Sequence, residues 1–224
     1  MPDYQTRIQT LTFGGMDFRI RSLLDRQQYA DPDGHAERAG IPPAHWSLFG
    51  QIWPAGRLLA EAMASHAGDG KRIRELGCGL GLASLVLQRR GADIVASDVH
   101  PLAETFLAYN AALNGLPALA YRTLRWDAPG NGLGRFDLII ASDVLYERGH
   151  ASLLVELVCR LATSRGEVLL ADPGRGNSNA FNRALRAQGY AVDEQRRPLD
   201  GNDAPPFRGR VIHYRRGVGE TGGV

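Results

Sequence analysis

The segment Arg74–Gly81 reads RELGCGLG and follows a short apolar run that begins at Ile73. A helix-like segment covers residues 82–90, and a second apolar run at 93–98 ends in Asp98. This order predicts a strand, a glycine loop, a helix and a second strand that ends in a carboxylate. Glycines let a ligand approach the main chain, and such a carboxylate is placed to accept hydrogen bonds from ribose hydroxyls. We therefore expect this unit to bind a nucleoside-containing ligand.

The glycine spacing indicates which nucleoside ligand to expect. A dinucleotide-binding loop has its third glycine three residues after the second, where a helix N-terminus faces a pyrophosphate. That position is Leu82 here, and the third glycine comes one residue earlier, at Gly81. Glu75 stands two residues before the first glycine, which suits a ligand without phosphates that has a cationic amino-acid end. S-adenosylmethionine is such a ligand, and we expect Glu75 to help neutralise its ammonium group through water or loop amides.

The bulk composition is that of a soluble globular protein. The chain has 224 residues, of which 44% are hydrophobic and 22% charged, and its net charge of +2 makes no case for nucleic-acid binding. Cys78 and Cys159 give neither a disulfide framework nor a metal-ligand spacing. A small side chain is what the loop requires at Cys78, with a catalytic thiol as the lesser alternative. Without a signal-peptide core or a membrane-length apolar run, we expect a cytoplasmic protein with no membrane partner.

Strand and helix patterns alternate along the chain and then change. We expect a hairpin at 8–24, a loop with one short helical piece at 31–43, helices at 55–66, 82–90, 101–113, 151–162 and 179–188, and strands at 73–76, 93–98, 119–126, 136–145, 167–172, 190–196 and 210–215. The last two strands are joined without a helix. These patterns predict an α/β fold with a doubly wound, Rossmann-like sheet of seven strands and a terminal antiparallel hairpin. Residues 1–45 are expected to form an N-terminal extension, 46–216 the main domain and 217–224 a flexible tail.

Four stretches resemble one known family. They are Phe49–Ala60 (FGQIWPAGRLLA), Glu75–Gly81, Ser97–Asp98 with Asn110 and Asn114–Gly115, and Asp137–Glu147 (DLIIASDVLYE). This combination resembles the seven-strand class I methyltransferases and, among them, methyltransferase family 16. That group includes protein lysine methyltransferases, and the piece at 171–175 is similar to the branch that modifies the electron-transfer flavoprotein β subunit. The resemblance implies an S-adenosylmethionine-dependent N-methyltransferase that acts on a protein lysine and leaves S-adenosylhomocysteine as product.

The resemblance also implies roles for residues around the cofactor. The tryptophan of the Trp-Pro pair would lie over the cofactor, the glycine loop would contact its methionine part, and Asp98 would hold its ribose. Trp126 would border the adenine, with Asp127 near the exocyclic amine and the main chain of Ala141 beside the cofactor. The expected cofactor-binding residues are Trp53, Glu75, Gly77, Cys78, Gly79, Gly81, Asp98, Trp126, Asp127 and Ala141. Without the resemblance, Trp53 would be interpreted as core, and Trp126 with Asp127 as a strand end and a turn.

Asp143, Tyr146 and Glu147 would line the place where the methyl acceptor enters. A carboxylate at the end of an apolar central strand, such as Asp143, is costly unless it is used or paired, and doubly wound sheets bind ligands at that end. We assign Asp143 and Tyr146 as catalytic. Asp143 would hold the lysine ammonium by its charge, while Tyr146 would supply an aromatic wall and a hydroxyl. In-line methyl transfer needs alignment of the reacting atoms rather than a metal or a covalent intermediate.

Three alternatives to a protein lysine methyltransferase stay open. The first is N-methylation of a small nicotinamide-like amine in the same fold. The second is a cofactor-binding assembly factor without catalysis, against which the presence of both Asp143 and Tyr146 argues. The third is a nicotinamide dehydrogenase, which the glycine spacing and the terminal hairpin disfavour. Residues 1–45 and 198–208 carry no pattern that identifies the acceptor.

Overall fold

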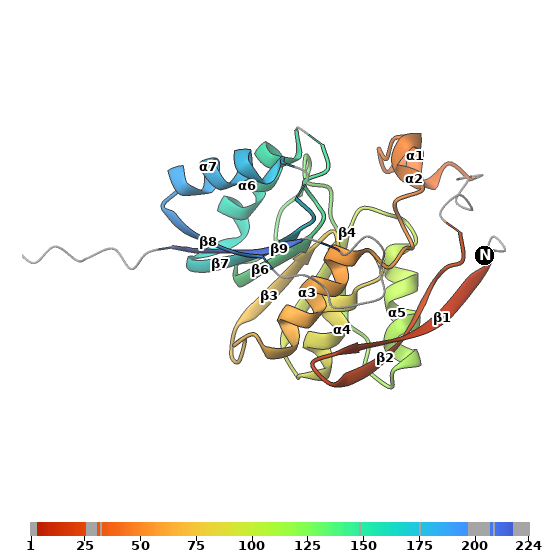
Figure 1. Cartoon of the computed structure of the whole chain (residues 1–224). Coiled ribbons are helices and arrows are strands. Elements are labelled where there is room, and N and C mark those ends of the chain that lie inside the picture. Colours follow the sequence, from red (N-terminus) through yellow and green to blue (C-terminus); the bar gives the residue numbers. More distant parts are fainter. Residues whose placement is uncertain are drawn as a thin grey trace, which may run out of the picture.

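A computed structural model describes residues 4–25, 31, 33–147, 149–174, 176–196, 207 and 209–216. Its main body is a sheet with helices on both faces, and a separate two-stranded hairpin lies beside one of the helical layers (Figure 1). The expected tail at 217–224, most of the loop at 198–208 and Arg175 lie outside the described residues. None of the helices within the described ranges is long and apolar enough to cross a membrane.

The described residues form a seven-stranded sheet in the order β5-β4-β3-β6-β7-β9-β8. The strands β3 to β7 run parallel and are β3 (Arg72–Leu76), β4 (Asp93–Asp98), β5 (Ala120–Thr123), β6 (Phe136–Ser142) and β7 (Ala162–Asp172). The strand β9 (Arg210–Arg216) pairs antiparallel with β7, and β8 (Tyr190–Arg196) pairs antiparallel with β9. The prediction of a doubly wound sheet with a terminal hairpin is therefore confirmed.

Two helical layers enclose the sheet (Figure 1). One layer consists of α3 (Pro54–Ser65), α4 (Leu82–Arg89) and α5 (Ala103–Leu113), and the other of α6 (His150–Leu161) and α7 (Ser178–Ala187). Along β6 the side chains alternate between the two cores: Leu138 and Ile140 pack under the first layer, while Ile139 and Ala141 pack under the second. All four are at most 4% exposed. A strand buried on both faces has no polar face, which explains the apolar run from Leu138 to Ala141 in β6.

Two strands are shorter than predicted, and both differences shape the cavity. The prediction placed Trp126 inside a strand, but β5 ends at Thr123. The prediction carried β6 to residue 145, but it ends at Ser142 because Asp143 adopts a left-handed conformation with a φ of 52°, which a strand cannot continue. As a result, Trp126 and the residues after Asp143 belong to loops at the carboxyl ends of the strands.

The described part of the N-terminal extension and its junction with the main domain contain one helix more than predicted. The hairpin forms as expected from β1 (Thr6–Phe13) and β2 (Met16–Leu23), and the short helical piece is α1 (His35–Arg38). A second four-residue helix, α2 (Pro43–Trp46), follows it. A single turn is too short to show a helical period in the sequence, so no pattern announces α2.

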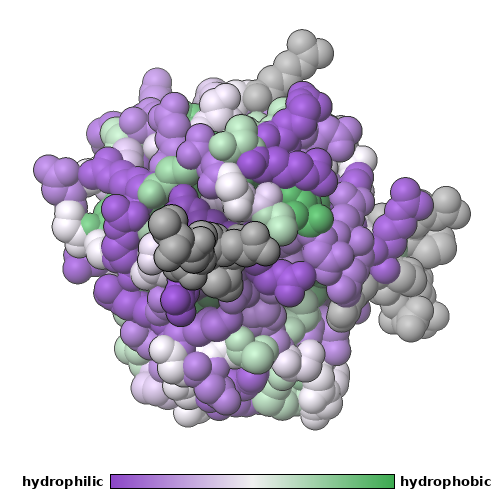
Figure 2. Space-filling model, turned by 90° about the vertical axis from the view of Figure 1, so that its left-hand side faces the viewer, coloured by the Kyte–Doolittle hydropathy of each residue, from purple (hydrophilic) through white to green (hydrophobic). Residues whose placement is uncertain are grey.

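The strand β8 forms an edge of the sheet and is polar on its exposed side. Asp193, Glu194, Gln195 and Arg196 are all exposed. The molecule seen from the left-hand side of Figure 1 is mainly hydrophilic, with small separate apolar patches (Figure 2). Charged residues on an edge strand discourage pairing with the edge of another chain.

A lysine is tied to the sheet near the amino ends of the parallel strands. Lys71, just before β3, is the only lysine in the sequence. Its Nζ lies 2.9 Å from Oε1 of Glu167, and Nε2 of His213 lies 2.7 Å from the other carboxylate oxygen. Burial raises the pKa of Glu167, but the hydrogen bonds from Lys71 and His213 outweigh that effect and leave the pKa below its ordinary value.

Two asparagines attach the hairpin to the main body. Asn110 Oδ1 accepts a hydrogen bond from the Arg21 amide at 2.8 Å, and one helical turn later Asn114 Oδ1 accepts one from the Arg19 amide, also at 2.8 Å. The Nδ2 groups of both asparagines donate to the carbonyls of the same two residues. The four-residue spacing on α5 therefore matches the two-residue spacing on β2, and the side-chain amides take the place of a neighbouring strand.

We predict that the two asparagines contribute unequally to stability. Asn110 is fully buried and also donates to the Leu80 carbonyl, so Asn110→Ala leaves buried peptide groups without partners and should lower the free energy of unfolding by about 1–3 kcal/mol. Asn114→Ala is the matched control, because water can reach its partners, and it should cost less than about 1 kcal/mol. Urea unfolding of both variants measures the difference, and equal losses would contradict this account of the attachment.

Candidate active site

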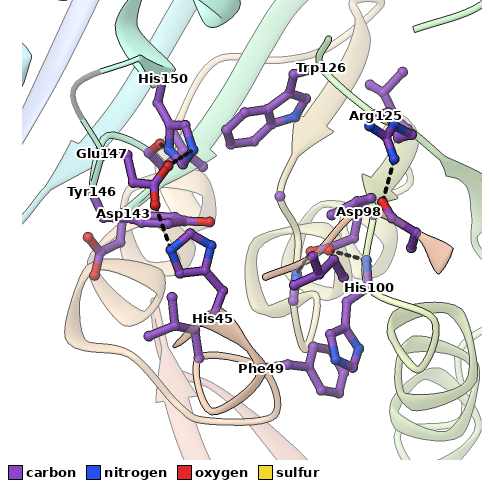
Figure 3. A pocket seen from close by; sticks show the side chains of 18 of the residues that line it. His45, Phe49, Asp98, His100, Arg125, Trp126, Asp143, Tyr146, Glu147 and His150 are labelled. Carbon is purple, nitrogen blue, oxygen red and sulfur yellow. Dashed lines mark hydrogen bonds and ion pairs between the residues drawn. The ribbon is translucent and has the colours of Figure 1, made fainter. Parts of the chain in front are cut away.

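A cavity of about 380 Å³ lies at the carboxyl ends of the parallel strands. One part of its wall consists of the loops that follow β3, β4, β5 and β6, and another part comes from residues 39–53 of the extension and its junction with α3. The predicted site residues that line it are Trp53, Gly77, Gly79, Asp98, Trp126, Asp127, Asp143 and Tyr146. Glu75, Cys78, Gly81 and Ala141 do not line it. Figure 3 shows the two sides of the cavity, with Asp98 and His100 opposite Asp143, Tyr146 and Glu147.

The glycine loop and Asp98 hold each other in place. Asp98 Oδ2 accepts a hydrogen bond from the Gly79 amide at 2.8 Å, and Oδ1 accepts one from the His100 amide at 2.8 Å. Gly79 has a φ of 53°, and a β-carbon there would meet no atom within 4 Å. Burial raises the pKa of Asp98, while the hydrogen bonds from the backbone amides oppose that effect. The carboxylate retains lone pairs that can accept further hydrogen bonds from a ligand in the cavity.

The third glycine of the loop serves packing between helices. Gly81 precedes α4 with a φ of 78°, and a β-carbon at this position would collide with the Leu107 side chain of α5. Only glycine allows both the left-handed conformation and this close approach. The expected contact of Gly81 with the cofactor stays a prediction, since Gly81 lies outside the cavity wall.

Glu75 is buried beneath the loop and caps the helix that follows it. Its side chain accepts hydrogen bonds from the Ser84 amide at 3.0 Å and from the Ser84 hydroxyl. Ser84 lies in the first turn of α4, whose N-cap residue, Gly81, has no side chain, so the Glu75 carboxyl satisfies a free amide of that turn. Burial raises the pKa of Glu75 to about 7. Its predicted role toward a cofactor ammonium stays a prediction, because the structure places it behind the cavity wall.

Cys78 and Ala141 also lie behind the wall. Cys78 is buried, and its amide donates to the Ser97 carbonyl at 2.9 Å. Burial, with the nearby carboxyl groups of Asp98 and Glu75, raises the pKa of the Cys78 thiol well above its ordinary value. A thiol that stays protonated is a poor nucleophile, which supports the small-side-chain interpretation over a catalytic one. Ala141 is a buried residue of β6, and the next residue, Ser142, lines the cavity.

Asp127 lies at the cavity wall in a bidentate pair with a neighbouring arginine. Arg125 Nη2 and Nε lie 2.7 Å and 3.1 Å from the two oxygens of Asp127, and Arg125 Nη1 donates to the Ala39 carbonyl at 2.6 Å. This arginine therefore fastens the N-terminal extension to the loop after β5. A second fastening lies below it, where the His100 ring stacks on Phe49 with 3.9 Å between ring centroids. Burial lowers the pKa of His100 to about 3, so the ring is neutral.

Asp143 and Tyr146 lie on the side of the cavity opposite Asp98 (Figure 3). The left-handed conformation of Asp143 is unusual for a residue other than glycine, and such conformations occur often at functional sites. Its amide donates to the Ala171 carbonyl at 2.9 Å, which fixes the turn to the end of β7. Burial, with the nearby carboxylates Asp98, Glu147 and Asp143, raises the pKa of Tyr146 to about 12.

Two histidines that were not predicted from the sequence also line this side of the cavity. His150 packs edge-on against Tyr146 and Trp126, with ring centroids 4.5 Å and 5.3 Å apart. His45, from α2, packs edge-on against Tyr146 at 5.3 Å. Both lie within hydrogen-bonding or ion-pair reach of Glu147 (Figure 3). The three-residue spacing of Glu147 and His150 was a usable signal, whereas His45 is more than 100 residues away in sequence.

Comparison with known proteins identifies the family. The lysine methyltransferase family matches residues 44–185, which is more than half of the chain. The chain belongs to the lysine methyltransferase family. The resemblance read from the four sequence stretches is therefore confirmed.

Two named relatives are similar in sequence to part of this chain. It is 31% identical over 172 residues to the electron transfer flavoprotein beta subunit lysine methyltransferase of Mus musculus, covering 72% of this chain and 64% of that protein. It is 29% identical over 146 residues to the protein of the same name from Danio rerio, covering 63% and 55%. The chain thus spans only 55% to 64% of the length of these two relatives.

A solved structure shows the same fold. The 16S rRNA N2 G1207 methyltransferase of T. Thermophilus, in complex with AdoMet and guanosine, superposes with a TM-score of 0.64, covering 97% of this chain and 52% of that one. The two sequences are 18% identical, so this likeness bears on the fold alone.

We predict that the raised pKa of Glu75 makes the free energy of unfolding depend on pH. The folded state holds its proton more tightly than the unfolded chain, since the pKa rises from 4.5 to about 7. The resulting stability is fully present below pH 4.5 and is lost as the pH rises through 7. Relative to Glu75→Gln, the wild type should lose up to about 3 kcal/mol of unfolding free energy across this range. Urea unfolding from pH 4 to 8 tests this, with Glu156→Gln, an exposed glutamate on α6, as the control that keeps the wild-type curve.

Proposed function

We propose that this protein is an S-adenosylmethionine-dependent N-methyltransferase that methylates a lysine of another protein. The observation that carries the proposal is that one cavity has a carboxylate placed to bind ribose, Asp98, on one side and the acidic and aromatic side chains of Asp143, Tyr146 and Glu147 on the other. A methyl donor and a cationic acceptor can therefore meet between these sides, at the end of the sheet where doubly wound folds bind ligands.

The cofactor side fits an adenosyl group and an amino-acid end. Asp98 can accept hydrogen bonds from ribose hydroxyls, and the ring of Trp126 with the buried side chain of Leu124 offers an apolar border for adenine. Gly77 and Gly79 line the cavity, and a main chain without side chains there can approach the methionine part of the cofactor. The cavity volume of about 380 Å³ is within the usual range for such ligands.

The acceptor side fits an alkylammonium group. Asp143 and Glu147 supply negative charge, and Tyr146 with the two histidines supplies ring faces and edges around it. Carboxylates and aromatic rings together attract a cation that has lost part of its water. The two named relatives act on the electron transfer flavoprotein beta subunit, so that protein is the first acceptor to test.

The residues of this chain would align the reactants and manage one proton. When bound, S-adenosylmethionine supplies a methyl group on a positively charged sulfur. Trp53 and the glycine loop would hold the donor side, while Asp143 would hold the incoming ammonium and keep its nitrogen pointed at the methyl carbon. A lysine side chain is mostly protonated at neutral pH and must lose a proton before it can attack. Alignment of this kind supplies a large share of the rate enhancement in bimolecular reactions.

We predict stabilisation by adenosyl ligands and none by NAD. At about 100 times its dissociation constant, a ligand that binds only the folded state adds about 2.7 kcal/mol. For a chain of this size, the melting temperature should rise by roughly 5–10 °C with S-adenosylmethionine or S-adenosylhomocysteine. Asp98→Asn should weaken both ligands about 10- to 100-fold, because it removes a charged hydrogen-bond acceptor. A rise in melting temperature with NAD alone, or no rise with any of the three ligands, would overturn the methyltransferase proposal.

We predict that the charge of Asp143 is needed for turnover. Asp143→Asn keeps the shape and tolerates the left-handed conformation, but it removes the charge that faces the ammonium. With radiolabelled S-adenosylmethionine and recombinant electron transfer flavoprotein beta subunit, kcat/KM should fall about 10- to 100-fold. Affinity for S-adenosylhomocysteine should stay within twofold of wild type. Label on a small amine such as nicotinamide, and on no protein in a lysate, would replace the protein-lysine proposal with the small-molecule alternative.

A further inference from the structure

A histidine of the N-terminal extension reaches a carboxylate of the acceptor side. Nε2 of His45, on α2, lies 2.6 Å from Oε1 of Glu147, in the loop after β6. The other oxygen of Glu147 lies 3.4 Å from Nε2 of His150, and Nδ1 of His150 lies 3.0 Å from the Val144 carbonyl. Glu147 therefore has its short contact with His45, and the His150 ring lies on the other side of the same carboxylate (Figure 3).

The contact with Glu147 decides which nitrogen of His45 carries the proton. A carboxylate can only accept a hydrogen bond, so Nε2 of His45 must be the donor. In the neutral ring, Nδ1 is then the nitrogen with the free lone pair. Within the described part of the chain, Glu147 is the hydrogen-bonding partner of this imidazole. A carboxylate that fixes the tautomer of a histidine is the arrangement by which proteins orient a histidine base.

The His45 ring borders the part of the cavity in which we propose that the acceptor amine binds. It lines the cavity and packs edge-on against Tyr146, 5.3 Å between ring centroids. The ionisable groups around it come from the β6–α6 loop and from α6: Glu147, Tyr146 and His150. The negative charges of Asp98 and Asp143 also reach this part of the cavity, since both raise the pKa of Tyr146. The His45 side chain is 17% exposed, which leaves solvent within reach of the ring.

Imidazole is the best matched of these groups for accepting a proton from an ammonium. Tyr146 keeps its hydroxyl proton at neutral pH, because its pKa is about 12. The reference pKa of an imidazole in water is near neutral, whereas those of carboxyl groups are about 4. A general base works best when its pKa lies near the working pH.

We propose that Nδ1 of His45 is the base that takes the proton from the acceptor lysine, and that Glu147 is the positioning residue that orients the ring. The inference rests on the proposed function and adds to it the fate of the proton. The ammonium gives one proton to Nδ1, and the neutral amine then forms a bond to the methyl carbon. The carbon–sulfur bond breaks with its electron pair staying on sulfur, and the imidazolium releases its proton to solvent.

The decisive variant is His45→Gln. The side-chain amide of glutamine can still donate a hydrogen bond to Glu147, but it has no basic nitrogen. With electron transfer flavoprotein beta subunit as acceptor, kcat at pH 7 should fall by about 100-fold, within the range for loss of a general base. The loss should shrink as the pH approaches 10, because the free amine then forms without help. KM and the affinity for S-adenosylhomocysteine should stay within twofold of wild type, and circular dichroism confirms folding.

Two outcomes of this assay would overturn the inference in different ways. A wild-type rate for His45→Gln, or a loss of the same size at every pH, means that His45 is at most structural while the proposed function stands. An inactive wild type, on this acceptor and on the proteins of a lysate, removes the proposed function and the inference with it.

The role of Glu147 has a readout that needs no acceptor. In the full chain labelled with ¹⁵N-histidine, NMR should show His45 as the tautomer protonated at Nε2, with and without S-adenosylhomocysteine. Glu147→Gln should mix the two tautomers, because an amide can either donate to Nε2 or accept from it. His45 protonated at Nδ1 in the wild type would overturn the inference whatever the enzyme assay shows.

Discussion

The hydrogen bond from the Gly79 amide to the Asp98 carboxylate joins the ends of β3 and β4, and one side of the cavity is built on this junction. It fixes the glycine loop in a left-handed conformation. Gly77 and Gly79 of the loop line the cavity, and so does Asp98. Beneath it, Glu75 caps α4, so a second carboxyl group holds the helix that follows the loop. Two acidic side chains from neighbouring strands thus set the loop, one from the cavity side and one from the core side. Without them, the loop would gain conformational freedom that the ligand would have to remove on binding.

The N-terminal extension and its junction with α3 complete the cavity from a distant part of the sequence. Residues 39–53 form part of its wall, and they are fastened by Arg125, which bonds the Ala39 carbonyl, and by Glu147, which bonds His45. Both fastenings go to loops at the carboxyl ends of β5 and β6, where the sheet itself offers no cover. The hairpin is fixed independently by Asn110 and Asn114 on α5. The extension is therefore tied to the main body at both its strands and its short helices.

The sequence was sufficient for those parts of the fold and site that depend on local pattern. The apolar run from Leu138 to Ala141 in β6 predicts burial on both faces, and the glycine loop with Asp98 is recognisable from its spacing alone. Strand ends were harder, because β6 stops where Asp143 takes a left-handed conformation that no periodicity announces. His45 and Glu147 meet through tertiary packing across about 100 residues, so no local pattern could pair them. Glu75 shows a different limit. The sequence places it next to the loop, but its side chain is directed into the core by hydrogen bonds from Ser84, which the sequence does not reveal.

The position of the single lysine in the sequence determines whether a molecule could methylate itself. Lys71 precedes β3 and is bound to Glu167, near the amino ends of the strands, whereas the cavity opens at their carboxyl ends. Under the proposed function, a molecule cannot bring its own lysine to its own site. The remaining basic residues of the sequence are arginines and histidines. In a mixture of enzyme and acceptor, methyl-lysine recovered after hydrolysis therefore counts modified acceptor directly, with no contribution from a molecule's own site to its own chain.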